Sequence, residues 1–295
     1  MLLLDCTLRD GGYLNNWEFS PEFGRSIYRE LSAAGVDIIE LGFLYNDGGY
    51  FKSLTPDKVS YLTQDTDASE ACVMIDYGKC DYNLPPKNKT NISMIRIAVH
   101  KHYLYHAFDL CKRIADDGYK TSVQMMNFPS YRREEVVDAL EKACDLKIDY
   151  LYVADSFGSM YSYQVYDPIA LMNAYGIGSG FHPHNNLHLA YANSLAAIEA
   201  KVSILDGTLL GVGRGAGNLS LEQIMLYLEL KNNNSYNMTR VFDLIEDYKI
   251  EFESCGYKSK CEYIISGLLN VHPNKVEELR ESGLRYSNIW KQLRI

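Results

Sequence analysis

The chain has 295 residues, of which 47% are hydrophobic and 23% charged, a composition typical of a globular protein with a sizeable core. Its formal net charge of -9 argues against broad binding to nucleic acids or anionic membranes. Seven irregularly spaced cysteines without a C-x-x-C motif argue against a disulfide scaffold or a structural zinc cluster, and favour a reducing cytoplasm. We expect no signal peptide, and no apolar stretch approaches the roughly 18 residues of a membrane span.

Short apolar runs, most of them rich in β-branched residues, predict buried strands. The predicted strands are Leu2–Thr7, Ile38–Phe43, Ala71–Tyr77, Met94–His100, Thr121–Asn127, Tyr150–Ser156, Ser179–Asn185 and Ser203–Leu210. Helical patterns lie between them. The predicted helices are Pro21–Ala34, His102–Asp117, Arg132–Leu146, Asp167–Ala174, Leu189–Lys201 and Leu219–Leu230. The third strand is followed by a poor helix pattern, and Leu84-Pro85-Pro86 predicts a short or irregular connection there.

Eight strands that alternate with helices over about 230 residues are typical of the α/β fold known as the TIM (β/α)8 barrel. An open, doubly wound sheet is the alternative, because alternation alone does not show that a sheet closes. A polar run at 231–235 separates this part from a remainder that has helical patterns and no strand pattern. We therefore predict a barrel domain at 1–231 and a helical extension at 232–295 that packs on it.

Polar residues cluster at the predicted carboxyl ends of the strands, where barrel enzymes place their working groups. They are Arg9, Asp10, Glu40, Arg96, His100, Asp155, Ser156, His182, His184 and the glycine-rich segment 211–218. His182 and His184 are two apart in a strand, so both imidazoles point to one face. With Asp10 they would form a two-histidine, one-carboxylate metal site suited to Mn, Fe, Co or Zn. The structural alternative is that both histidines are ordinary core or rim residues.

Arg9, Tyr13 and the glycine-rich segment are further candidates for this site. Arg9 could stabilise a developing oxyanion, although an Arg beside an Asp is more often a salt-bridged surface residue. Tyr13 could act as an acid/base or hydrogen-bond donor, or could simply pack. Backbone N–H groups at Gly213 and Gly215 could bind a substrate carboxylate. A dinucleotide site is disfavoured, because the segment follows the last strand.

These residues together resemble the DRE-TIM metallolyase superfamily, whose members are similar to HMG-CoA lyase. The resemblance is strongest to the 4-hydroxy-2-oxovalerate aldolases and covers the whole barrel. The segments that carry it are Thr7–Gly11, Arg96–His100, Val153–Met160, His182–His184, Asn186–Ser194 and Gly215–Glu222.

The resemblance implies three metal ligands, Asp10, His182 and His184, most often for Mn²⁺, with Mg²⁺, Co²⁺ or Zn²⁺ as alternatives. It implies that Arg9 stabilises a pyruvate enolate. Asn218 matches a further metal ligand in the lyase branch, and Ser156 matches a residue near the bound 2-oxo acid. The aldolases usually carry a His where this chain has Tyr13, and an unperturbed Tyr is a poorer base at neutral pH. Three alternatives follow: the site tunes Tyr13, a metal-bound water takes the proton, or the substrate differs.

The reaction expected from this resemblance is a class II aldol cleavage of a 4-hydroxy-2-oxo acid to pyruvate and an aldehyde. The alternatives are a Claisen condensation of an acyl-CoA with a 2-oxo acid, and a metal-binding barrel that acts as a partner or sensor. A homodimer is expected by resemblance. The tail is too short to imply the aldehyde dehydrogenase partner of the aldolases, although Tyr263–Glu278 weakly resembles part of their docking extension.

Overall fold

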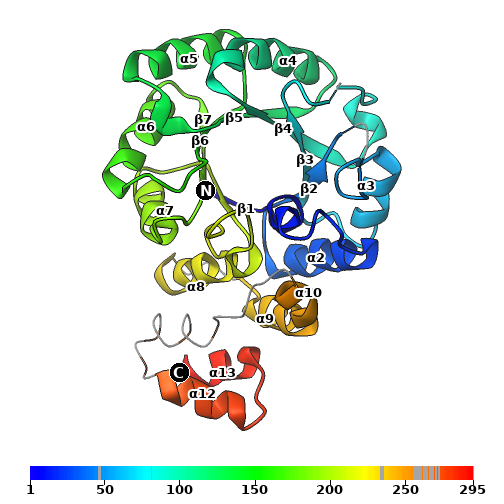
Figure 1. Cartoon of the computed structure of the whole chain (residues 1–295), viewed down its shortest axis with the longest axis vertical. Coiled ribbons are helices and arrows are strands. Elements are labelled where there is room, and N and C mark those ends of the chain that lie inside the picture. Colours follow the sequence, from blue (N-terminus) through cyan, green and yellow to red (C-terminus); the bar gives the residue numbers. More distant parts are fainter. Residues whose placement is uncertain are drawn as a thin grey trace.

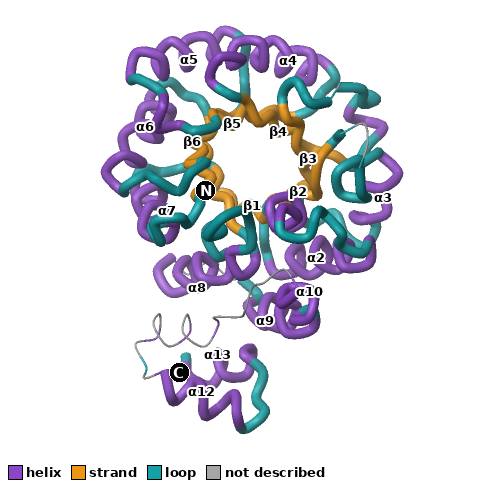
Figure 2. Tube along the Cα trace, viewed as in Figure 1, coloured by secondary structure: helices purple, strands orange, loops and turns teal. Residues whose placement is uncertain are grey.

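The computed structural model describes residues 1–45, 48–80, 82–232, 236–254 and 273–294, together with residues 261, 265, 269 and 271. Its centre is a closed barrel of parallel strands in the order β1 to β8 (Figures 1 and 2). The strands are β1 (Leu2–Asp5), β2 (Ile38–Phe43), β3 (Glu70–Asp76), β4 (Ile92–Val99), β5 (Lys120–Met125), β6 (Tyr150–Asp155), β7 (Gly178–Pro183) and β8 (Ile204–Gly207). Pairing of β1 with β8 closes the sheet, so the open-sheet alternative is wrong.

Helices surround the barrel, as the alternating pattern predicted (Figure 1). They are α2 (Pro21–Ala34), α3 (Pro56–Thr63), α4 (Leu104–Asp116), α5 (Arg133–Asp145), α6 (Ser162–Ala174), α7 (Ala190–Glu199) and α8 (Leu221–Asn232). The short helix α1 (Thr7–Asp10) directly follows β1 and is buried. The sequence reading missed α3, which is short but is capped by Thr55 and starts with a proline. It also started α6 five residues too late, because Pro168 lies inside this helix rather than at its start.

Helices continue beyond the barrel, in the region predicted as a helical extension. They are α9 (Met238–Asp247), α10 (Lys249–Ser254), α12 (Pro273–Glu281) and α13 (Tyr286–Leu293). α9 and α10 lie beside α2, where the Tyr248 hydroxyl is 2.7 Å from Ser26 Oγ and the Tyr248 ring is 4.8 Å from Phe23. Much of the predicted resemblance at Tyr263–Glu278 lies outside the described residues.

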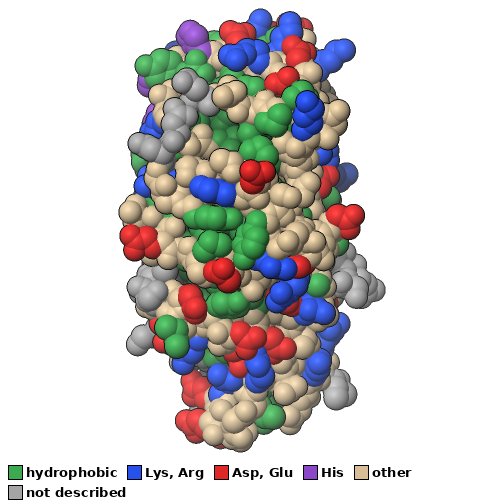
Figure 3. All heavy atoms as spheres, turned by 90° about the vertical axis from the view of Figure 1, so that its right-hand side faces the viewer, with side chains coloured by type: hydrophobic (Ala, Val, Ile, Leu, Met, Phe, Trp, Pro, Cys, Tyr) green, Lys and Arg blue, Asp and Glu red, His purple; other side chains and the backbone are tan. Residues whose placement is uncertain are grey.

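The outer surface mixes charges of both signs. On the face seen in Figure 3, outside the grey atoms, basic and acidic side chains are interspersed over the barrel helices and the carboxy-terminal helices. This face therefore carries no continuous basic region.

In the described part of the chain, no helix is both long and apolar enough to cross a lipid bilayer.

The inside of the barrel is layered, and the layers explain where a polar site can form. The lower layer is apolar and includes Leu4, Cys72, Met94 and Tyr152, all fully buried. A Cβ on Gly180 would lie 2.2 Å from the Tyr152 ring, so the missing side chain makes room for that ring. Charged side chains form the next layer toward the carboxyl ends of the strands, and the candidate site lies above them.

Candidate active site

Three buried side chains meet at the carboxyl ends of β1 and β7, as the sequence predicted. Asp10 ends the short helix α1 after β1, while His182 lies in β7 and His184 follows it. Their ligand atoms lie within 4.8 Å of one another, and His182 Nε2 is 4.0 Å from Asp10 Oδ2. The two rings have centroids 5.0 Å apart. This geometry and donor set suit one divalent ion, with positions left for other ligands.

Asn218 joins this cluster from the glycine-rich segment, where a bridge pairs it with His184. Its Nδ2 donates to Asp10 Oδ2 at 2.5 Å and to the Val212 carbonyl at 3.0 Å. Its Oδ1 is buried and has no hydrogen-bond partner among the described residues. A buried amide oxygen without a partner is costly unless something else binds it. The orphaned oxygen therefore fits the prediction that Asn218 is a fourth metal ligand.

Glycines in this segment let its backbone approach neighbouring polar side chains closely. A Cβ on Gly213 would lie 2.3 Å from Asn218 Nδ2 and 2.8 Å from Asp10 Oδ2, and its φ of +159° disfavours other residues. Gly215 instead faces the Asn186 side chain. Substrate binding by the backbone N–H groups of Gly213 and Gly215 stays a prediction.

Arg9 is held rigidly beside the cluster. Its Nη1 donates to Asp10 Oδ1, its Nε donates to Glu40 Oε2 at 2.7 Å, and its carbonyl accepts from Trp17 Nε1. Burial raises the pKa of Asp10, but Arg9 and the two histidines outweigh burial and hold that pKa well below its usual range. Burial lowers the pKa of His184 to about 4. At neutral pH the carboxylate is thus ionised and this imidazole neutral, the forms that bind a metal.

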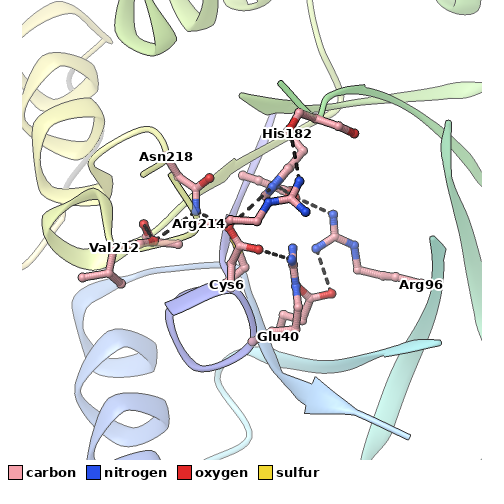
Figure 4. A network of polar contacts seen from close by, with 12 residues as sticks. Cys6, Glu40, Arg96, His182, Val212, Arg214 and Asn218 are labelled. Carbon is pink, nitrogen blue, oxygen red and sulfur yellow. Dashed lines mark hydrogen bonds and ion pairs between the residues drawn. The ribbon is translucent and has the colours of Figure 1, made fainter. Parts of the chain in front are cut away.

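A layer of buried charges supports these groups from below (Figure 4). Asp206 Oδ2 lies 2.9 Å from His182 Nδ1 and also accepts a 2.5 Å hydrogen bond from Arg96. Because a carboxylate is an acceptor, His182 Nδ1 carries a proton, and in the neutral form of the ring the Nε2 lone pair then faces the cluster. Arg96 also forms a 3.0 Å ion pair with Glu40, the partner of Arg9. Arg96 therefore connects the support of His182 to the support of Arg9.

Sequence reasoning did not assign these supporting roles. Glu40 and Arg96 were placed near the barrel mouth without partners, and Asp206 was not singled out. The available signal was an ionisable residue within each of three otherwise apolar strands. Lys, Glu, Arg and Asp are almost never fully buried without partners, so such residues indicate a buried network.

A cavity of about 210 Å³ opens above the cluster. It is lined by Arg9, Asp10, Tyr13, Met74, Asp76, Lys79, Ala98, His100, Gln124, Met126, Ala154, Ser156, His182, His184 and Arg214. We call the lining residues Asp10, His182 and His184, together with their neighbour Asn218, which does not itself line the cavity, the ligand half. We call Asp76, Lys79, His100 and Gln124, which come from β3, β4 and β5 and the segments after them, the open half.

The predicted residues Tyr13 and Ser156 both line this cavity. Tyr13 is 41% exposed, and its ring lies 4.6 Å from the Trp17 ring. Desolvation raises the pKa of Tyr13 above its ordinary value of 10, despite the opposing charge of Arg9. The phenol therefore stays protonated at neutral pH and can donate a hydrogen bond. Ser156 Oγ accepts from the backbone N–H of Asn127 at 2.9 Å.

Comparison with known proteins identifies the family. A family model described as HMGL-like matches residues 89–247, more than half of the chain. The chain belongs to the HMGL-like family. Among curated relatives of this HMGL-like protein, the 4-hydroxy-2-oxovalerate aldolase of Carboxydothermus hydrogenoformans is 30% identical, over 83% of this chain and 76% of that enzyme. The oxaloacetate decarboxylase of Mycobacterium tuberculosis is 26% identical, over 99% of this chain and 90% of that enzyme.

Solved structures share the fold of this chain. The amino-terminal domain of a candidate aldolase from Bacteroides vulgatus superposes with a TM-score of 0.78 at 24% identity, over 94% of this chain and 96% of that one. An HMG-CoA lyase from Acinetobacter baumannii superposes with a TM-score of 0.66 at 16% identity, over 88% of this chain and 92% of that one. At these identities, the two structures establish that this HMGL-like protein has their fold.

Proposed function

We propose that the protein is a class II aldolase that cleaves a 4-hydroxy-2-oxo acid reversibly into pyruvate and an aldehyde. The observation that carries the proposal is the placement of the Arg9 guanidinium directly beside Asp10, His182 and His184. A fixed cation next to a metal site is suited to a negative charge that develops on a bound substrate. The family membership and the aldolase relative support the same class of carbon–carbon lyase.

The ligand half fits a divalent metal ion, and the resemblance favours Mn²⁺. Asp10 and Asn218 would supply oxygen ligands, and His182 and His184 would supply neutral nitrogen ligands. The ion would act as a Lewis acid on the 2-oxo group of the substrate. Asp206 would fix the orientation of the His182 ring through Nδ1.

The residues of the chain then have distinct tasks in the cleavage. As the C3–C4 bond breaks, the hydroxyl proton on C4 leaves and the electron pair of that bond becomes the enolate of pyruvate. Arg9 would hold the enolate charge, because its guanidinium is already oriented by Glu40 and needs no rearrangement. Protonation of the enolate at C3 gives pyruvate, and C4 becomes the aldehyde.

Removal of the C4 hydroxyl proton needs a base. The residue that would supply it is where this chain differs from the aldolases that it resembles, because it has Tyr13 in place of their usual His. The raised pKa of Tyr13 makes its phenolate scarce at neutral pH, so Tyr13 would donate a hydrogen bond to the C4 oxygen instead of removing its proton. His100 lines the same cavity and is not one of the three clustered metal-ligand residues. We assign the proton to His100.

A second candidate reaction is the decarboxylation of a 2-oxo acid that carries a carboxylate on C3. It would give the same enolate with loss of CO2 and would need no base at C4, which agrees with Tyr13 being a weak base. The Mycobacterium tuberculosis relative, which matches almost the whole chain, is named for this reaction of oxaloacetate. A Claisen condensation is the remaining alternative.

Exchange of the methyl protons of pyruvate in deuterated water tests enolate formation without knowledge of the aldehyde. We expect the full-length protein loaded with Mn²⁺ to exchange them, and a chelator to stop the exchange. Cleavage of 4-hydroxy-2-oxo acids, release of CO2 from oxaloacetate and product formation from acetyl-CoA then separate the three reactions. Absence of both exchange and cleavage would reject the aldolase and favour a non-catalytic metal-binding barrel.

A further inference from the structure

Two arginines and one lysine line the cavity, and they differ in their pairing. Arg9 is paired with Asp10 and Glu40, and Lys79 Nζ lies 2.7 Å from Asp76 Oδ2. Arg214 has no carboxylate within ion-pair distance among the residues that the structure describes. Its Nη2 donates to the backbone carbonyl of Ser156 at 3.2 Å. Among the described residues, the cavity thus presents one guanidinium that has no ion-pair partner.

Arg214 spans the mouth of the cavity above the ligand half. It leaves the glycine-rich segment after β8, and its hydrogen bond reaches Ser156 at the end of β6. Its guanidinium carbon lies 5.8 Å from the centre of the Tyr13 ring, which follows β1. Figure 4 shows the side chain of Arg214 extending from the side of Asn218 toward His182. The residue is exposed, so a ligand can reach it from solvent.

The position beside Tyr13 indicates which end of the substrate Arg214 meets. In the proposed reaction, the carboxylate and 2-oxo group bind at the ligand half, and C4 lies next to Tyr13. Lys79 lines the same cavity, where its hydrogen bond with Asp76 raises its pKa and the positive charge of Arg214 opposes that increase. A planar guanidinium pairs with a carboxylate through two parallel hydrogen bonds, which an ammonium group cannot do.

We propose that Arg214 binds a second carboxylate of the substrate, beyond C4, so that the substrate is a dicarboxylic 4-hydroxy-2-oxo acid and the released aldehyde is anionic. This inference rests on the proposed function. It also separates the two candidate reactions. A guanidinium that holds a departing carboxylate stabilises the reactant more than the transition state, so this contact favours aldol cleavage over decarboxylation.

Binding of two matched, uncleavable ligands tests the inference. 2-Oxoglutarate and 2-oxopentanoate differ only in a terminal carboxylate or methyl group, and both lack the 4-hydroxyl group. Calorimetric titration of the Mn²⁺-loaded, full-length protein should show about 10- to 100-fold tighter binding of 2-oxoglutarate, the range for hydrogen bonds to a charged group. Arg214→Ala should remove this preference, and Arg214→Lys should retain part of it.

Arg132→Ala is the matched control, because Arg132 is exposed, precedes α5 and does not line the cavity. It should leave the preference for 2-oxoglutarate intact. Equal affinities of wild-type protein for the two ligands would overturn the inference. So would an Arg214→Ala variant that binds both ligands more weakly but by the same factor, because Arg214 would then hold the carboxylate common to both. Pyruvate exchange by wild-type protein tests the proposed function separately, so either idea can fail alone.

Discussion

The two halves of the cavity differ in burial and in pairing. In the ligand half, Asp10, His182 and Asn218 are buried, and buried partners fix their orientation. In the open half, Lys79 and His100 are exposed. A buried, paired arrangement holds its charges in one geometry before a substrate arrives, whereas exposed ion pairs contribute little and can rearrange at low cost. We infer that the ligand half, together with Arg9, binds and activates the 2-oxo acid, and that the open half, together with Arg214, receives the C4 end of the substrate.

The largest effect should follow loss of a ligand from the ligand half. His184→Ala removes a neutral nitrogen that no other described residue of the cluster replaces. We expect metal content to fall and pyruvate exchange to drop about 10³-fold, because the ion supplies several kcal/mol of charge stabilisation. Elemental analysis and proton NMR measure the two quantities. His102→Ala, on an exposed histidine outside the cavity, is the control. Full metal content in His184→Ala would contradict its assignment as a ligand.

Removal of Arg9 should give the next largest effect. If Arg9 holds the enolate charge, Arg9→Ala should lower pyruvate exchange about 10²- to 10³-fold, as loss of an oxyanion donor does. Metal content should fall far less than exchange. Because the substitution also leaves Glu40 buried without this partner, circular dichroism must show that the variant is folded. Arg25→Ala changes a surface arginine paired with Asp65 and serves as control. Near-wild-type exchange in folded, metal-loaded Arg9→Ala would exclude the role.

The support beneath the ligands should matter less than the ligands themselves. Asp206→Asn keeps the shape but weakens the contact to His182 Nδ1, and we expect metal affinity to fall about 10- to 100-fold. Competition with a chromophoric chelator measures this affinity. Asp149→Asn is the comparison. Asp149 accepts a hydrogen bond from the Thr121 N–H near the start of β5, outside the cavity, and the substitution weakens that contact in the same way. Equal metal affinities in the two variants would show that Asp206 has a general structural role.

How far the sequence predicts this molecule depends on the range of the interactions. The meeting of His182 and His184 was predictable because strand geometry places alternate residues on one face. The position of Asp10 beside them was predictable because Asp10 follows a buried strand. The link from Arg96 to Asp206 was not predictable, because β4 and β8 approach only across the closed barrel. The position of the Arg214 guanidinium was not predictable either. Arg214 lies in a glycine-rich segment, and such a segment has no periodicity from which the direction of a side chain can be predicted.

Tyr13 lies where the two halves meet, and its removal should have the smallest effect of the four substitutions. A protonated phenol that donates one hydrogen bond to the C4 oxygen contributes about 1 kcal/mol, so Tyr13→Phe should slow cleavage of a 4-hydroxy-2-oxo acid about 5-fold. Pyruvate exchange should fall less than cleavage, because pyruvate has no C4 oxygen.

The pH dependence of cleavage distinguishes this donor from a base. Because desolvation raises the pKa of Tyr13 above 10, the phenol stays protonated throughout the neutral range, and its ionisation should not produce a rise in rate between about pH 6 and 9. If Tyr13 were the base, the rate would rise with pH toward its pKa, and Tyr13→Phe would lose that rise together with most of the activity. Parallel pH profiles of wild-type protein and Tyr13→Phe would instead exclude Tyr13 as the base, and His100→Gln would then test the acceptor that we assign in the open half.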